Sequence, residues 1–381
     1  MTFLDSELLD RIHSRAEKHD RENTFPFDDY AELKEAGYYK AFVPQEFGGH
    51  GLTLAQIANE QTRLAKAAPG TALGINMHQI IVGLGRHMVA RGNKQGEQIL
   101  RGAAEGELYG FGISEPANDK VLFGSLTDAR PDGKGGYSFH GRKVFTSLSP
   151  AWTKLMTFGE DSTSEDAPKS VFAILDREAG GFEILDDWDT MGMRATQSNS
   201  TVLDGAHADE SAVLTRIDPG ASIDPVVLGI YGNFEILLAA TYAGIGERAV
   251  EVAVETVKKR KSVAKGTTYS NDPDIRRIIA TAAVEMDGVQ AHIEHIANAF
   301  DALEDRGFKW LPQLSAVKHR SAEASLFSVQ QAVRASGGSS YYNSKELSRL
   351  YRDVVAGLFQ PSDAESLYAG WATMLLGPIE E

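Results

Sequence analysis

The chain of 381 residues contains no cysteine. This absence excludes disulfides, iron–sulfur clusters, thiolate zinc sites and thiol nucleophiles. The first residues also lack a basic segment followed by a long apolar run, so no signal peptide is expected. The longest apolar run with helical spacing, residues 236–246, is too short to cross a bilayer. We therefore expect a cytoplasmic protein without a membrane span.

Positive charge is also scarce. The sequence has 38 lysines and arginines against 53 aspartates and glutamates, and its net charge is −15. A chain this acidic is a poor match for nucleic acids or anionic membranes, so no nucleic-acid partner is expected. The phosphate-binding signatures of Rossmann and P-loop enzymes and the nucleophile elbow of α/β-hydrolases are missing too. His292 and His295 share a helical spacing without an acidic cluster beside them, so we expect no metal site.

What the sequence does contain falls into three zones. Residues 1–109 place apolar side chains at helical spacing. Residues 110–220 alternate short β-like runs with turns rich in glycine. Residues 221–381 return to long helical patterns with few turns between them, which is typical of an antiparallel bundle. The predicted fold class is α+β, with an N-terminal helical domain, a middle antiparallel β-domain and a C-terminal antiparallel helix bundle.

Four short segments carry groups that can serve chemistry, and each also has an ordinary structural interpretation. An apolar strand runs into the polar turn 114–119, which is also a common loop exit. Residues 143–147 place an aromatic ring beside two hydroxyls, as a half-buried edge strand does. The cations at 258–261 suit a helix C-terminus. The glycine pair at 337–338 exposes backbone N–H groups that can approach a phosphate, and it also suits a plain turn.

Together and in this order, the segments resemble the acyl-CoA dehydrogenase superfamily over nearly the whole chain. The matching motifs are Val-Pro-Gln-Glu-Phe-Gly-Gly-His-Gly-Leu at 43–52, Ser-Glu-Pro at 114–116, Met-Gly-Met-Arg-Ala-Thr-Gln-Ser at 191–198, Gly-Gly at 337–338 and Arg-Asp at 352–353. The resemblance implies the same helix–sheet–helix order and a flavin held between the β-domain and the C-terminal bundle. It also implies assembly as a homotetramer or homodimer. FAD is the expected flavin, and FMN is the alternative.

The resemblance further implies three groups of cofactor-binding side chains. The first lines the flavin ring, the second faces the ring from its other side, and the third holds the pyrophosphate, partly from a neighbouring subunit. In order, the groups are Phe111, Ile113 and Ser114; Phe145, Thr146 and Ser147; and Arg260, Ser262, Arg334, Gly337 and Gly338. Arg334 stands where the family often has glutamine, and an arginine there can still bind phosphate.

The position of the usual catalytic base departs from the family pattern. That base is a glutamate nine residues after the arginine of the Arg-Asp motif, and here the position holds Pro361, which cannot take a proton. Some members take the base from the first long C-terminal helix, at a position that aligns with Phe234. Glu235 is one residue away, about 100° around the helix, and is the candidate catalytic residue. Asp363 and Glu365 are further candidates that also fit a helix start.

Three functions are therefore weighed. The main expectation is α,β-dehydrogenation of an acyl thioester such as an acyl-CoA, with electrons leaving to an electron-transfer flavoprotein. The first alternative is a flavin-dependent monooxygenase of the same fold that uses O2 and reduced flavin from a partner flavin reductase. The chain between residues 352 and 361 looks closer to this branch. The second alternative is a non-catalytic protein that binds a flavin or an acyl group.

Overall fold

Five α-helices form the N-terminal part of the computed structural model, which describes residues 2–164 and 167–379. They are α1 (Ser6–Glu22), α2 (Phe27–Glu35), α3 (Leu54–Ala67), α4 (Pro69–Ala90) and α5 (Gly96–Glu105). Side chains fix two of the helix starts. Asp5 accepts a hydrogen bond from the Leu8 amide ahead of α1, and Thr53 forms a capping box with Gln56 at α3. The predicted N-terminal helical domain is confirmed.

The middle of the described chain is one eight-stranded sheet in the order β6-β7-β3-β2-β4-β5-β8, with β1 also paired to β4. The strands are β1 (Tyr109–Gly112), β2 (Asp128–Pro131), β3 (Tyr137–Lys143), β4 (Lys154–Asp161), β5 (Lys169–Asp176), β6 (Phe182–Ile184), β7 (Thr201–Ala208) and β8 (Val213–Ile217). Most neighbours are antiparallel, as predicted, whereas the β1–β4 and β2–β4 pairs are parallel. Parallel pairs need crossover connections that local turn patterns do not reveal. The β-domain is therefore a mixed sheet.

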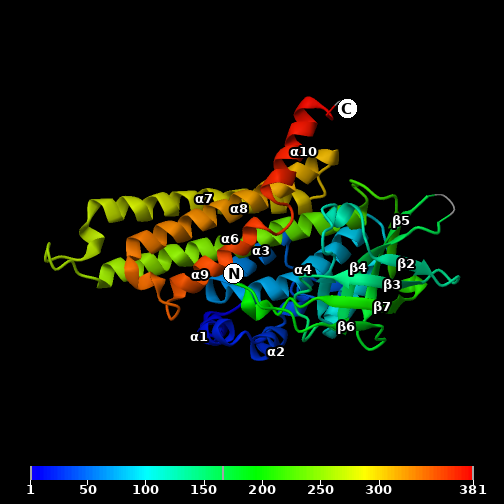
Figure 1. The fold of residues 1–381 in the computed structure, drawn as a ribbon, viewed down its shortest axis with the longest axis horizontal. Coiled ribbons are helices and arrows are strands. Elements are labelled where there is room, and N and C mark those ends of the chain that lie inside the picture. Colours follow the sequence, from blue (N-terminus) through cyan, green and yellow to red (C-terminus); the bar gives the residue numbers. More distant parts are fainter. Residues whose placement is uncertain (1, 165–166, 380–381) are drawn as a thin grey trace.

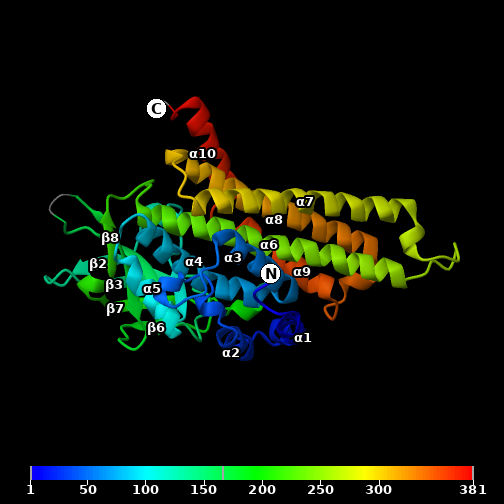
Figure 2. The ribbon, with the colours of Figure 1, turned by 180° about the vertical axis from the view of Figure 1, so that it is seen from behind.

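Five more α-helices follow in the described residues: α6 (Pro225–Lys259), α7 (Pro273–Asp301), α8 (Trp310–Ser336), α9 (Glu346–Val354) and α10 (Ala364–Leu376). The long helices α6, α7 and α8 run side by side, and α3 and α4 lie against α6 (Figure 1, and from behind in Figure 2). The helix α10 leaves the bundle at a steep angle, near the end that meets the sheet (Figure 1). The predicted C-terminal antiparallel bundle is confirmed.

The helix α6 is the central element of the molecule. Its 35 residues span about 50 Å at 1.5 Å per residue. By length and composition α6 is long and apolar enough to cross a membrane, whereas the run 236–246 alone is too short. However, 89% of the apolar 18-residue stretch of α6 is buried inside the fold. The helices α6 and α3 approach closely at Gly244 of α6. A Cβ at this position would lie 2.4 Å from the Thr62 carbonyl oxygen, so the contact requires glycine. The apolar surface of α6 is thus occupied by packing.

The Arg-Asp motif at the end of α9 joins the bundle to the rest of the molecule. Arg352 forms an ion pair with Asp20 of α1, with Nη1 to Oδ1 at 2.8 Å. The buried Asp353 accepts a hydrogen bond from the Met193 amide at 2.6 Å. Gly192 permits this approach, because a Cβ there would lie 2.2 Å from the Arg352 carbonyl oxygen. Two of the motifs found in the sequence therefore form one joint between sheet, bundle and N-terminal helices.

Candidate active site

A cavity of about 290 Å³ lies where the end of β1 and the loop after it meet α6, α8 and α10. Apolar side chains from these elements make up most of its wall. The wall residues that bear on function are Phe111, Ile113, Ser114, Tyr231, Phe234 and Glu235. A mostly apolar cleft with a few placed polar groups is the usual form of a small-molecule site. This cavity is therefore the candidate active site.

Glu235 reaches the cavity from α6 and is fully buried. Its Oε1 accepts a hydrogen bond from the Ser362 amide at 2.9 Å, and its Oε2 has no hydrogen-bond partner among the described residues. Burial raises the pKa of Glu235 to about 7, although the Lys318 charge, the Ser362 amide and the nearby Tyr231 hydroxyl oppose that rise. The carboxyl can therefore gain or lose a proton near neutral pH, as a general base must.

Phe234 and Glu235 both line the cavity, although neighbouring helix residues point about 100° apart. The Phe234 ring lies to one side, with its centroid 5.6 Å from that of Phe111. The sequence left the direction of Glu235 open, and the structure places its carboxyl at the cavity wall. The other candidate acids do not line the cavity: Asp363 caps α10, and Glu365 is exposed.

The first predicted group of flavin contacts lies on the part of the wall that β1 and the chain after it form. Phe111, Ile113 and Ser114 all line the cavity, at the end of β1 and just beyond it. The Val144 amide donates a hydrogen bond to the Ser114 carbonyl at 2.9 Å. This contact places the start of the second predicted group, residues 145–147, next to the first.

The second group combines an open ring with hydroxyls. The Phe145 side chain is 64% exposed and meets the Trp188 ring edge to face. The Thr146 hydroxyl is buried without a hydrogen-bond partner among the described residues. The Ser147 hydroxyl is paired with that of Ser198 at 2.8 Å. An open aromatic face, an unpaired hydroxyl and a neighbouring apolar cavity fit a flat ring system with a polar edge, which is the chemistry of a flavin.

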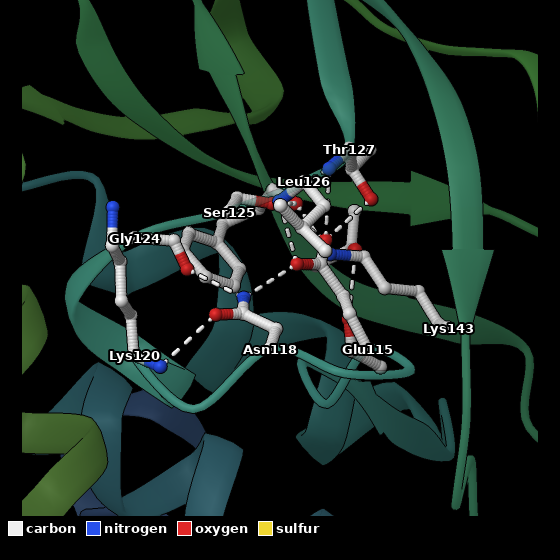
Figure 3. A network of polar contacts seen from close by, with 11 residues as sticks. Glu115, Asn118, Lys120, Gly124, Ser125, Leu126, Thr127 and Lys143 are labelled. Carbon is white, nitrogen blue, oxygen red and sulfur yellow. Dashed lines mark hydrogen bonds and ion pairs between the residues drawn. The ribbon is translucent and has the colours of Figure 1, made fainter.

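The glutamate of the Ser-Glu-Pro motif does not line the cavity but ties together the loop that forms part of its wall (Figure 3). Its carboxylate accepts hydrogen bonds from Lys143, the Ser125 and Thr127 hydroxyls, the Leu126 and Thr127 amides and the Asn118 side chain, at 2.6–3.0 Å. Burial opposes the charge of Glu115, but Lys143 and these donors outweigh it and lower its pKa to about 2. Glu115 is therefore a structural anion.

The predicted pyrophosphate-binding residues lie at the far end of the bundle, where α6 and α8 both end: Arg260, Ser262, Arg334, Gly337 and Gly338. Arg260 is 25 positions after Glu235, which corresponds to about 37 Å along α6. Its guanidinium donates to the Ser336 carbonyl at 2.7 Å and lies 4.6 Å from the centroid of the Tyr269 ring. Within one chain, the structure does not bring this group and the cavity together, because the length of α6 separates them.

Four residues around Glu235 were not predicted: Tyr231, Ser315, Lys318 and Ser362. Tyr231 lies one turn before Glu235 on the same face of α6, and its hydroxyl is paired with that of Ser315 at 2.5 Å. The i, i+4 spacing was the available signal for Tyr231. Lys318 and Ser362 approach Glu235 from α8 and from the segment before α10, and no local pattern marks them.

Comparison with known proteins gives two family matches. The model described as "Acyl-CoA dehydrogenase, N-terminal domain" matches residues 4–107, and "Acyl-CoA dehydrogenase, C-terminal domain" matches residues 236–359. L-evernosamine nitrososynthase from a Micromonospora species is 29% identical, over 92% of this chain and 84% of that protein. The putative acyl-CoA dehydrogenase YdbM of Bacillus subtilis is 27% identical, over 93% of this chain and 91% of that protein.

A solved structure extends the comparison to three dimensions. The X-ray structure of KijD3 in complex with FMN and dTDP-3-amino-2,3,6-trideoxy-4-keto-3-methyl-D-glucose matches with a TM-score of 0.86 and 27% identity, over 98% of this chain and 92% of that chain. Similar chains of this fold are thus named for different reactions, so the chemistry of the site has to distinguish them.

Proposed function

Because the chain belongs to the acyl-CoA dehydrogenase superfamily, we propose that it is a flavin-dependent oxidoreductase that dehydrogenates an acyl thioester between its α and β carbons. FAD is the proposed cofactor, with FMN as the alternative that the KijD3 complex favours. The observation that carries the proposal is the Glu235 carboxyl, which is buried at the cavity wall with one oxygen unpartnered among the described residues. It supplies the proton acceptor that Pro361 cannot.

The cavity supports this choice of substrate. Its wall is mainly apolar, with Leu311 and Pro312 from α8, Leu367 from α10 and Leu122 from the loop after β1. Such a wall accommodates the hydrocarbon part of an acyl group and excludes water from the reacting atoms. Glu235 is the carboxyl on this wall whose pKa burial raises toward neutral pH.

The roles of the residues follow from this placement. Glu235 would take the α proton, which the polarised thioester carbonyl makes more acidic, and the proton would neutralise a buried charge. A bound flavin would supply the acceptor for the hydride from the β carbon, and the product would carry a C=C bond. Phe111, Ile113 and Ser114 would hold the flavin on one side, and Phe145, Thr146 and Ser147 on the other.

The proposal predicts that thioesters reduce the flavin in the absence of oxygen. Flavin-loaded protein is titrated anaerobically with a panel of acyl-CoA thioesters while the visible flavin band is followed. At least one thioester should bleach the band, and Glu235→Gln should slow bleaching by about 10²- to 10⁴-fold, as expected for loss of a general base. The exposed Glu365→Gln is the matched control and should bleach like the wild type. Absence of bleaching by every thioester, or full-rate bleaching in Glu235→Gln, would contradict the proposal.

A second candidate is a flavin-dependent monooxygenase that takes reduced flavin from a reductase. The likeness to L-evernosamine nitrososynthase, at 29% identity over 92% of this chain, favours it. In that case the protein would bind reduced flavin and consume O2 in the presence of substrate, and no thioester would bleach the oxidised flavin. Oxygen uptake measured with a supplied flavin reductase separates this function from the dehydrogenase, and a protein that shows neither activity would be a non-catalytic binder.

The same proposal includes a redox partner and an oligomeric state. A dehydrogenase of this kind passes electrons to an electron-transfer flavoprotein, which is the proposed protein partner. The distance of Arg260 from the cavity along α6, about 37 Å, supports a homotetramer or homodimer in which the pyrophosphate-binding residues serve the flavin of a neighbouring subunit.

A further inference from the structure

Lys318 is a buried cation with a distinctive set of partners. Its side chain extends from α8, and the residue is 1% exposed. The ammonium donates hydrogen bonds to the backbone carbonyls of Gly357, Gln360 and Ser362, at 2.7 Å to Gly357 and 3.1 Å to Ser362. A lysine has three N–H donors, so these contacts use all of them.

The three carbonyls belong to one short connection, residues 357–362, which leads from the 3-10 helix η9 (Val355–Leu358) toward α10. The same connection forms part of the cavity wall. Its Ser362 amide donates the hydrogen bond to Oε1 of Glu235, at 2.9 Å. Lys318 and Glu235, which stand on the adjacent helices α8 and α6, therefore hold the same six-residue connection.

We propose that Lys318 is a positioning residue for the Glu235 carboxylate. By fixing the connection, its ammonium keeps the Ser362 amide on Oε1 and leaves Oε2 free at the cavity wall. An apolar side chain would fill the same space but could not donate to the three carbonyls, so the ammonium does more than pack. The inference rests on the proposed function, in which Glu235 accepts the substrate proton.

The charge of Lys318 and the Ser362 amide that it holds in place both favour the ionised form of Glu235. Glu235, Asp363 and Glu323 are the carboxylates that act on it, and Tyr231 is the other titratable group near Glu235. Burial raises the pKa of Glu235, and the Lys318 charge limits that rise. Removal of the ammonium should therefore make Glu235 hold its proton more tightly, both through the lost charge and through a loosened Ser362 amide.

The test measures the protonation of Glu235 in the full-length protein and does not depend on turnover. The free energy of unfolding is determined from about pH 4 to pH 9 for the wild type and for Glu235→Gln, and the difference gives the protonation midpoint of Glu235 by linkage. The same pair is measured with Lys318→Met added to both. We expect the midpoint to rise by about one unit or more, which is at least a tenfold gain in proton affinity. The exposed Lys309→Met is the matched control and should leave the midpoint unchanged.

Amide hydrogen exchange supplies an independent readout. In Lys318→Met, the amides of residues 357–360 and of Ser362 should exchange about tenfold faster or more, while those in the middle of α7 keep the wild-type rate. If Lys318→Met does not fold, Lys318→Gln, which retains two N–H donors without the charge, replaces it in the same comparison. An unchanged midpoint together with unchanged exchange overturns the role of Lys318. Full-rate flavin reduction in Glu235→Gln instead overturns the proposed function, so the two failures are distinguishable.

Discussion

Two buried glutamates, Glu115 beside the sheet and Glu235 in the bundle, differ in how completely their carboxylates are hydrogen-bonded. Both oxygens of Glu115 accept hydrogen bonds, and the Lys143 ammonium contacts Oε1 at 2.7 Å. Glu235 accepts one hydrogen bond, from the Ser362 amide, and its second oxygen has no hydrogen-bond partner among the described residues. The nearby Lys318 ammonium donates to backbone carbonyls. The pKa of Glu115 is about 2, and that of Glu235 is about 7.

The comparison teaches that burial alone does not decide what a carboxylate does. Both residues lose most of their solvation on folding, which disfavours the charged form. Where donors replace the lost water, as at Glu115, the anion is fixed and holds a loop in place. Where they replace it only in part, as at Glu235, the group is left able to exchange a proton with a bound molecule.

The largest expected effect is the loss of stability when the buried ion pair between Lys143 and Glu115 is broken. Lys143→Met leaves the Glu115 anion buried without its cation and should lower the free energy of unfolding by about 3–5 kcal/mol. Since the folded-state pKa of Glu115 lies at about 2, below its ordinary value of 4.5, the Glu115 anion loses its contribution to stability as the pH falls from about 4.5 toward 2. Burial lowers the pKa of Lys143 to about 8, so both members of the pair are charged at pH 7. Urea denaturation at pH 7 and pH 3 measures both effects.

A double variant keeps this prediction sharp. Glu115→Gln combined with Lys143→Met removes both charges, so its loss of stability should be smaller than the sum of the two single losses. Additive losses would show that the two residues contribute independently, and the contrast with Glu235 would then lose its basis.

The opposite sign is expected for Glu235. Its folded-state pKa of about 7 lies above the ordinary 4.5, so the folded protein binds more protons between these values and stability falls as the pH rises through that window. Glu235→Gln removes the titration. Relative to the wild type, the variant should therefore gain stability between pH 5 and pH 8, by up to about 3 kcal/mol. Denaturation midpoints at the two pH values test this, and a loss of relative stability at pH 8 would contradict it.

More of the fold than of the candidate site could be predicted from the sequence. Periodicity and turn density are local signals, so they located the helical and β zones, while the parallel pairs of β4 with β1 and β2 depend on crossovers that leave no local pattern. The Ser-Glu-Pro and 143–147 motifs both stood out, yet only the fold shows that Glu115 and Lys143 are paired.

The neighbourhood of Glu235 shows why the rest of the site could not be predicted. Its direction depends on which face of α6 meets the cavity, and packing against α8 and α10 decides that. Lys318 is separated from its carbonyl acceptors by 39–44 residues, and a lysine in the middle of a helical pattern indicates a solvated face. Contacts of this kind come from tertiary structure alone.

The smallest expected change in stability comes from breaking an exposed ion pair on β2, the strand that follows the loop held by Glu115. Arg130 contacts Asp128 on β2 at 2.7 Å, and the two side chains are 57% and 40% exposed. Water and salt screen this pair, so Arg130→Ala should change the free energy of unfolding by less than about 0.5 kcal/mol. Because β2 begins one residue after Thr127, a donor to Glu115, the variant also tests whether the loop tolerates surface changes. A loss as large as that of Lys143→Met would mean that strand position, rather than saturation of the Glu115 carboxylate, sets the stability of this region.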